Sequence, residues 1–296
     1  MKPSYLIILL LLNFCWAAVY SAYKMLGQSL LTGGIVTLRF GLAGLLLLMV
    51  WPWLPGPAPR GWDLIKTCIL GIVVYVAGQR LQVYGNHLGS AGNSAVLMAM
   101  EPLLASVAAA IFLREHIGPR RWAGFGLGVL GVALLNGVWR KDFQWVGLTA
   151  SLIFISSFVC EAVYSVMGKT IIERASPTKM VAISLLIGTA GNLLIDGART
   201  FVDAKALPIQ GWVLLLAMAT VCTAIGYCMW FVILRECPVN VAALTIFVQA
   251  VFGVFIAWLW LGEKLHWGQF WGCLAIVAGL VLGLSRQIKK TTEAHP

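Results

Sequence analysis

Charged residues are scarce in this chain, and their scarcity excludes a soluble globular protein. Only 11% of the 296 residues are Asp, Glu, Lys or Arg, whereas 60% are hydrophobic. A soluble domain carries about twice that share of charge. The apolar residues also form long blocks, several of which reach the roughly 20 residues needed to cross the core of a bilayer. The lipid bilayer is therefore the expected surrounding of this fold.

Metal-binding and catalytic patterns are lacking as well. The seven cysteines are scattered without a Cys-x-x-Cys pair, and the four histidines lie at the ends of apolar blocks or between them. We therefore expect no metal and no cofactor. A Gly-x-Gly-x-x-Gly pattern at 126–131 lies inside an apolar block with no preceding strand, so it predicts a helix-packing surface and not a nucleotide site.

The apolar blocks predict an all-α integral membrane protein with ten transmembrane helices. The first block lacks an Ala-x-Ala cleavage site, so we expect it to be a helix and not a signal peptide. The expected spans are 4–24, 32–52, 64–84, 92–113, 121–138, 146–168, 179–198, 211–234, 239–261 and 267–286.

The distribution of basic residues predicts the orientation of the chain. Arg39 and Arg80 fall inside spans. With both termini on one side, the opposite side receives only Lys24, Arg140, Lys141, Arg199, Lys205 and Lys264, and all other Lys and Arg residues fall on the side of the termini. This bias predicts cytoplasmic termini in the cell inner (plasma) membrane, and it explains the net charge of +10 without a nucleic-acid partner.

An internal repeat divides the sequence into halves. The segment Leu113-Arg114-Glu115 is followed by Gly124 and Gly131, and 148 residues later Leu261-Gly262-Glu263 is followed by Gly272 and Gly279. Ala18-Val19-Tyr20-Ser21 likewise returns as Ala162-Val163-Tyr164-Ser165. The expected repeats are residues 1–138 and 146–286, with a cytoplasmic tail at 287–296. Because five crossings make one repeat, the second copy enters from the opposite face and is inverted, as alternating access requires.

The pattern of a proline, a Leu-x-Glu about twelve residues later and then a glycine-spaced helix resembles the EamA family of the drug/metabolite transporter superfamily. It reads Glu101-Pro102, Glu115 and Gly124 in the first half, and more weakly Gln249-Ala250, Glu263 and Gly272 in the second. The resemblance covers essentially the whole chain, and it implies a membrane transporter, more often an exporter. Ala250 in place of the second proline, and Glu101 before the first, depart from the family pattern.

Charged residues near the middle of a span need a reason, because each costs at least ~2.5–3.5 kcal/mol to insert. Glu101, Arg39 and Glu161 are such residues. In one interpretation, Glu101 and Glu161 face a wet central cavity, where they bind a cationic substrate or exchange protons. In the other, Glu101 and Arg39 only neutralise one another. Gln249 is the repeat counterpart of Glu101, so both should face the shared interface.

Aromatic and amide side chains complete the predicted site. Trp16 and Tyr20 lie one helical turn apart in the first span, and Tyr164 follows Glu161, which together would make an aromatic wall suited to ammonium groups. Ordinary packing is the alternative. Tyr75 and Gln79 recur at helical spacing and would line the same cavity, or else form hydrogen bonds between helices.

The sequence thus predicts a secondary transporter for a small polar metabolite such as an amino acid, amine or quaternary ammonium compound. Protons are the candidate coupling ion, and the chain is expected to be a monomer or a homodimer. A membrane enzyme acting on a lipid-linked substrate would need a nucleophile, base or metal set, which the sequence does not offer, so we expect no enzyme. A structural or receptor-like membrane protein would need neither mid-membrane carboxylates nor inverted repeats.

Overall fold

The computed structural model describes residues 2–88, 97–135, 137–141, 148–261 and 267–293, and every regular element in these ranges is helical. Helices suit a bilayer because they satisfy their own backbone N–H and C=O groups. The prediction of an all-helical protein is confirmed. The elements are α1 Pro3–Leu26, α2 Thr32–Met49, η1 Trp51–Trp53, α3 Trp62–Ile72, η2 Val73–Gly78, α4 Gln79–Leu88, α6 Met100–Phe112, α7 Pro119–Leu135, α8 Leu148–Ile172, α9 Pro177–Ala206, α10 Ile209–Ala217, η3 Met218–Ile225, α11 Gly226–Glu236, α12 Val239–Leu244, η4 Thr245–Phe247, α13 Val248–Leu261 and α14 Trp267–Glu293.

Several helices are long and apolar enough to cross a membrane. Within the described ranges there are seven: Pro3–Leu26, Thr32–Met49, Trp62–Leu88, Thr149–Ile172, Pro177–Ala206, Ile209–Glu236 and Trp267–Leu284. The shorter apolar helices Met100–Phe112 and Val239–Gly253 fall on further predicted spans. The chain is therefore a multi-pass membrane protein. The last helix, α14, continues to Glu293, beyond the expected end of the last span at residue 286.

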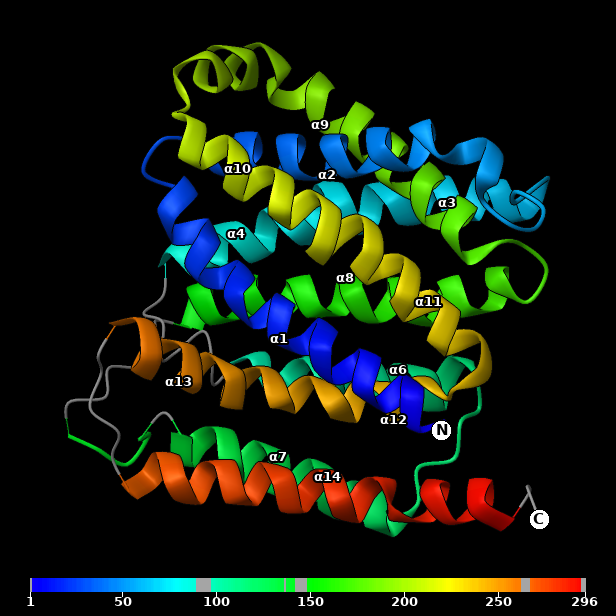
Figure 1. The fold of residues 1–296 in the computed structure, drawn as a ribbon, viewed down its shortest axis with the longest axis vertical. Coiled ribbons are helices and arrows are strands. Elements are labelled where there is room, and N and C mark those ends of the chain that lie inside the picture. Colours follow the sequence, from blue (N-terminus) through cyan, green and yellow to red (C-terminus); the bar gives the residue numbers. More distant parts are fainter. Residues whose placement is uncertain (1, 89–96, 136, 142–147, 262–266, 294–296) are drawn as a thin grey trace.

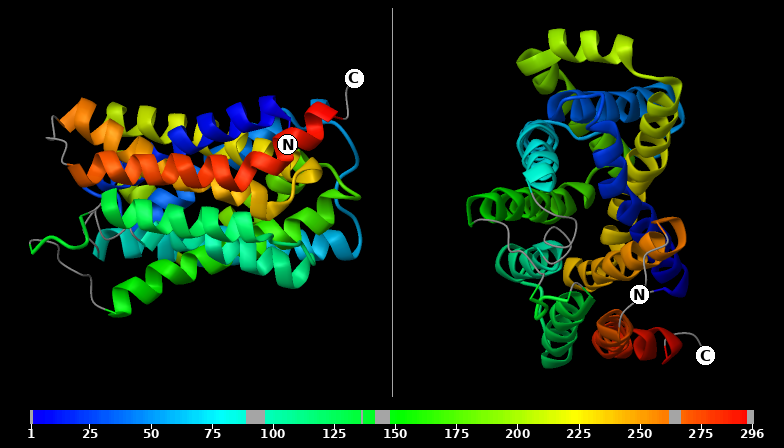
Figure 2. Two further views of the ribbon diagram at one scale, coloured as in Figure 1. Left: turned by 90° about the horizontal axis from the view of Figure 1, so that it is seen from below. Right: turned by 90° about the vertical axis from the view of Figure 1, so that its left-hand side faces the viewer.

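The helices form a stack in which two pairs occupy the ends (Figure 1). Helices α2 and α9 pack together at one end, and α7 and α14 pack together at the other. Between them, α1 and the α10–α11 run cross obliquely over α8, as the turned views also show (Figure 2). Helix α1 begins and α14 ends on the same side of the stack, which is the arrangement that the loop charges predict.

Glycines allow α7 and α14 to approach closely. A Cβ atom built on Gly124 would meet the carbonyl oxygen of Gly279 at 2.7 Å, and one built on Gly131 would meet that of Gly272 at 2.7 Å. The reverse contacts are equally close. Any larger side chain would push the backbones apart, so Gly124, Gly131, Gly272 and Gly279 form a helix-packing surface. Of the pattern at 126–131, Gly131 belongs to this surface, whereas a Cβ atom on Gly126 would meet no neighbour in the described part of the chain.

The third helical run of each half contains a π-helical segment. In the first half it is η2, and in the second it is η3. One carbonyl in each accepts a hydrogen bond from another helix: Tyr75 from Asn192 Nδ2 and Cys222 from Trp16 Nε1, both at 2.8 Å. In a π segment, backbone hydrogen bonds join residues five apart along the chain, not four as in an α-helix. The side chains that follow the segment are therefore rotated about the helix axis relative to an ordinary α-helix.

The side of the stack where α1 begins is tied together by Glu115, in the segment between α6 and α7. Its carboxylate pairs with Lys169 at 3.0 Å and accepts from the backbone N–H groups of Val239 and Asn240 at 2.8 and 3.0 Å. Two free N–H groups at the start of α12 are thereby satisfied. Glu115 therefore has a structural role at a helix end. Glu263, its repeat counterpart, lies outside the described residues.

Two other charged residues of the predicted spans pair with each other. Arg80 donates to Asp196 at 2.9 Å and to Asn192 at 2.6 Å. Asp196 lies where α9 departs from helical geometry, with φ −145° and ψ 23°. Neither residue lines the cavity described below. Their opposite charges neutralise one another within the helix stack.

Candidate functional site

The candidate site forms where two helical runs are interrupted. Helix α6 begins at Met100 after a turn at Ala99, and α13 begins at Val248 after the short helix η4. Glu101 and Gln249 each occupy the second position after the interruption, 148 residues apart. Pro102 fits here because the first turn of a helix has no intrahelical partner for its N–H groups.

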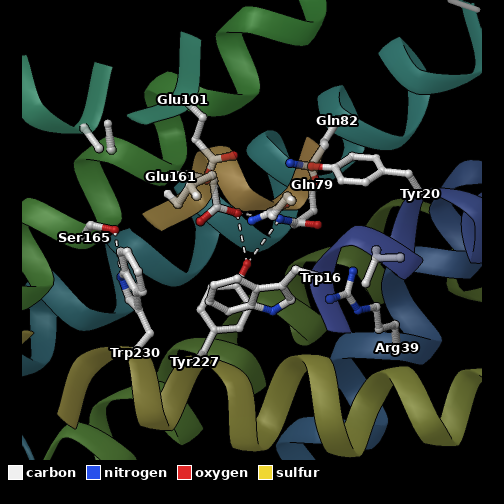
Figure 3. Close-up of a pocket in the computed structure, with 15 residues that line it drawn as sticks. Trp16, Tyr20, Arg39, Gln79, Gln82, Glu101, Glu161, Ser165, Tyr227 and Trp230 are labelled. Atoms are coloured by element: carbon white, nitrogen blue, oxygen red, sulfur yellow. Dashed lines mark hydrogen bonds between the residues drawn. The ribbon is translucent and has the colours of Figure 1, made fainter. Parts of the chain in front are cut away.

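These interruptions border a cavity of about 70 Å³ inside the helix stack (Figure 3). A buried water needs about 10–15 Å³ of such space, so the cavity has room for several waters or a small polar group. Its lining residues are Trp16, Val19, Tyr20, Arg39, Gln79, Gln82, Glu101, Ala105, Glu161, Ala162, Ser165, Tyr227, Trp230, Ile246 and Gln249.

Glu161, on α8, has two hydrogen-bond donors in this cavity. Gln79 Nε2 donates to its Oε1 at 2.6 Å, and the Tyr227 hydroxyl donates to the same atom at 3.0 Å (Figure 3). Hydrogen bonds to an ionised carboxylate are stronger than neutral ones. The Glu161 side chain is therefore fixed in position.

Arg39, on α2, is buried in the opposite wall. It donates to the Tyr23 hydroxyl and, through Nε, to Thr223 Oγ1 at 2.8 Å. Its guanidinium also lies 5.5 Å from the centre of the Tyr23 ring and 4.9 Å from that of Phe40. Cation–π contacts of this kind stabilise a desolvated guanidinium.

Glu101 differs from both of these residues. Its carboxylate points into the cavity toward Glu161 (Figure 3), and in the described part of the chain it accepts no hydrogen bond and forms no salt bridge. Glu101 thus lines the cavity, and the hydrogen bonds of Arg39 go to Tyr23 and Thr223.

Gln249 is held in place by Asn13 of α1. Gln249 Nε2 donates to Asn13 Oδ1 at 2.8 Å, and Asn13 Nδ2 donates to Thr245 Oγ1 at 3.1 Å. Asn13 is fully buried and spans the interruption between α12 and α13. Asn13 was not among the predicted site residues, although a single amide in an otherwise apolar N-terminal block is a signal that could have found it.

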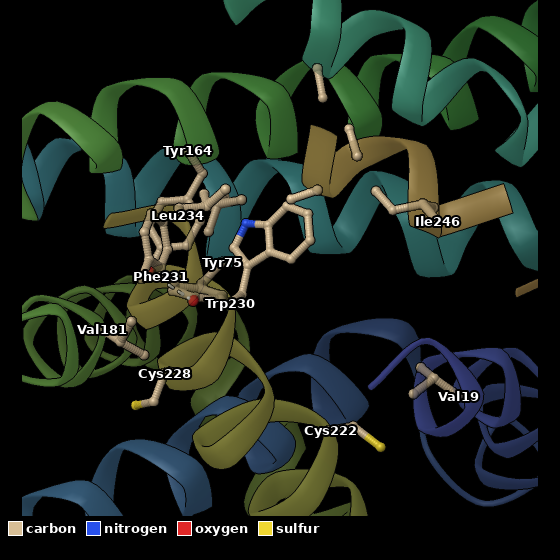
Figure 4. Packing of buried hydrophobic residues seen from close by; sticks show 14 of the residues in the cluster. Val19, Tyr75, Tyr164, Val181, Cys222, Cys228, Trp230, Phe231, Leu234 and Ile246 are labelled. Carbon is tan, nitrogen blue, oxygen red and sulfur yellow. Dashed lines mark hydrogen bonds between the residues drawn. The ribbon is translucent and has the colours of Figure 1, made fainter. Parts of the chain in front are cut away.

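The structure brings most of the predicted site residues together, namely Glu101, Glu161, Trp16, Tyr20, Gln249, Arg39 and Gln79. Tyr75 and Tyr164 are not in the lining. Their hydroxyls lie 3.0 Å apart, and both rings contact that of Tyr227. The Tyr164 ring also packs edge-on against Phe231 (Figure 4). Tyr75 lies within η2, where the π-helical register turns it away from the face that Gln79 presents.

Two aromatic residues of the lining were not predicted. Tyr227 and Trp230 lie on α11, three residues apart, and both contact Trp16, with ring centres 6.2 and 5.9 Å away. Trp230 Nε1 also donates to Ser165 Oγ at 3.2 Å. Their signal in the sequence is an aromatic pair three residues apart in the second half of the span 211–234.

Comparison with known proteins places this geometry in context. The profile of the EamA-like transporter family matches residues 3–137 and again residues 148–285. The uncharacterized transporter YyaM of Bacillus subtilis is 22% identical over 250 residues, which cover 82% of this chain and 81% of that protein. The probable terminal-alkyne amino-acid exporter of Streptantibioticus cattleyicolor is 22% identical over 279 residues, 94% of this chain and 93% of that protein. A solved crystal structure superposes on 96% of this chain and 99% of its own with a TM-score of 0.78 at 17% identity, a likeness of fold alone.

Proposed function

This chain belongs to the EamA-like transporter family, and we propose that it carries a small polar metabolite through the central cavity by alternating access. Amino acids, amines and quaternary ammonium compounds are the candidate substrates. Export or exchange is the proposed direction, because one relative is named an exporter. The proposed location is the inner (plasma) membrane with both termini in the cytoplasm, as the loop charges favour.

The proposed architecture is ten transmembrane helices in two inverted repeats, residues 1–138 and 146–286. The reciprocal contacts of α7 and α14 support it, because the contact of Gly124 with Gly279 repeats as that of Gly272 with Gly131. A two-fold relation between halves produces such reciprocal pairs. The π segments η2 and η3 and the two helix interruptions lie at matching positions and support the same relation.

One observation carries the proposed function: the polar side chains that follow the two helix interruptions line the same buried cavity. Glu101 comes from the first half and Gln249 from the second. Transporters commonly bind substrate and coupling ion between their repeats, at interrupted helices near the midplane. A protein that only scaffolded the membrane would gain nothing from an unpartnered carboxylate in this position, because the charge is costly there.

Alternating accessibility of the cavity tests this proposal. Cysteines would be introduced at Ala105 and Ala162, small lining residues whose replacement keeps every charged group, in a variant whose native cysteines are replaced. We expect a membrane-impermeant thiol reagent to label both positions from either side of oriented vesicles. A cysteine at the exposed Glu173 is the matched control and should react from one side only. Labelling of positions 105 and 162 from one side only, or from neither, would contradict alternating access.

A further inference from the structure

We propose that the substrate of this cavity is an organic monocation, whose charged group binds at Glu101 in exchange for a proton. This inference rests on the proposed transport function and specifies the charge of its substrate. It follows from the balance of charges in the cavity wall. The described charged side chains in that wall are Arg39, Glu161 and Glu101.

Arg39 and Glu161 are joined by an unbroken chain of hydrogen bonds. Arg39 donates to the Tyr23 hydroxyl, Tyr23 donates to Gln79 Oε1 at 3.1 Å, and Gln79 Nε2 donates to Glu161 Oε1 at 2.6 Å. Every bond in the chain runs in the same direction, from the cation to the anion. Such aligned bonds polarise one another, so the charge of the guanidinium is matched to that of Glu161 across the cavity.

Glu101 is then the one charge in the described lining that remains without a counterpart. The groups that share its cavity are Glu161 on α8, Arg39 on α2, Tyr20 on α1, Tyr227 on α11, Gln82 on α4 and Gln249 on α13. Among them the only cation is Arg39, which is already matched. A buried unpaired carboxylate is expensive, so Glu101 requires either a proton or a bound cation. A substrate of charge +1 replaces the proton and leaves the cavity neutral.

The shape of the wall fits a cationic nitrogen. Trp16, Tyr20, Tyr227 and Trp230 surround the space beside the carboxylates (Figure 3). Aromatic faces attract ammonium groups, most strongly where water is excluded. An anionic substrate would add a second unmatched negative charge. A zwitterion would leave the charge of Glu101 in place, because its own two charges cancel.

Two series of small ligands that differ in which charged groups they carry test this inference. Ethylamine, alanine and propionate form a small series, and phenethylamine, phenylalanine and 3-phenylpropionate form a larger one. Binding to the purified protein is measured by isothermal calorimetry at several pH values. We expect the better amine to bind at least about tenfold more tightly than its zwitterion and its acid, a difference that one charged contact can supply. Its affinity should fall as the pH is lowered, because the proton and the ammonium group compete for Glu101.

Variants of Glu101 complete the test. Glu101→Gln should weaken amine binding at least about tenfold and remove its pH dependence, whereas Glu101→Asp keeps the charge and should retain both. Glu173→Gln, at an exposed carboxylate outside the cavity, should bind like the wild-type protein. Binding of neither amine, or binding of a zwitterion or acid at least as tightly, would overturn the monocation assignment. Transport itself would then still be judged by the labelling of positions 105 and 162.

Discussion

The two interrupted helices of this protein are alike in backbone and different in chemistry. In the first half, Glu101 follows the interruption and its carboxylate has no partner in the described part of the chain. In the second half, Gln249 stands at the matching position and is held by Asn13. One half therefore presents an exchangeable charge, and the other presents a fixed amide.

This difference shows how a repeat can keep its shape while its halves divide their roles. The interruption recurs in both halves although different residues form it, Ala99 in the first half and Thr245–Phe247 in the second. The residue that follows is free to change, because it points into the cavity and not into the packing between helices. We infer that binding and coupling depend on the first half and that the second half provides a rigid wall.

Removing the free charge is expected to have the largest effect. Glu101→Gln should abolish the pH dependence of substrate flux in proteoliposomes and lower the flux itself by about tenfold or more, since a charged hydrogen-bonding group is lost. The measurement is flux at several pH values with substrate in excess. An unchanged flux and pH profile would refute the coupling role of Glu101.

Moving the charge to the other half sharpens the comparison. Adding Gln249→Glu to the Glu101→Gln variant places a carboxylate on the opposite wall of the same cavity. We expect part of the pH dependence of flux to return, because the cavity again contains one unmatched acid. Asn13 accepts from Gln249 in the structure, so its amide would have to turn over to donate to the new carboxylate, and the recovery should be incomplete. If the flux of the double variant is as low as that of Glu101→Gln, transport requires a carboxylate at position 101 and not merely one unmatched acid in the cavity.

Removing Asn13, which holds the Gln249 amide in place, is expected to destabilise the protein. Asn13→Ala leaves Gln249 and Thr245 without their buried partner, which should cost about 1–3 kcal/mol of unfolding free energy. Ser157→Ala is the matched variant, because Ser157 on α8 is the repeat counterpart of Asn13, 144 residues later, and among the described residues its hydroxyl bonds only to Phe154 of its own helix, at 2.6 Å. It should cost less than about 1 kcal/mol. Denaturation of the two variants in detergent compares them, and equal losses would contradict the difference between the halves.

The sequence predicted the helices and most of the cavity for a simple physical reason. A polar group in an apolar span must face away from lipid, so Glu101, Arg39, Glu161 and Gln249 could converge in few other places. Periodicity failed at Tyr75 because the π segment η2 changes the helical register, and no residue type announces such a segment. Tyr227 and Trp230 were missed because aromatic residues are equally common at membrane interfaces.

The smallest predicted effect concerns the π segment of the second half. Trp16→Phe keeps an aromatic ring in the cavity wall but removes the N–H group that donates to the carbonyl of Cys222 in η3. The carbonyl of Tyr75 in η2 would still be held by Asn192, so only one of the two segments loses its outside bond. We expect the maximal transport rate to change about fivefold while the KM stays close to wild type, since a hydrogen bond contributes about 1 kcal/mol and the binding surface is kept. Trp230→Phe is the control, because its N–H group bonds to a serine side chain and not to a π segment. If both variants lower the rate equally, the bond to η3 has no special part in transport; if only Trp16→Phe does, the π segment of the second half moves during the cycle.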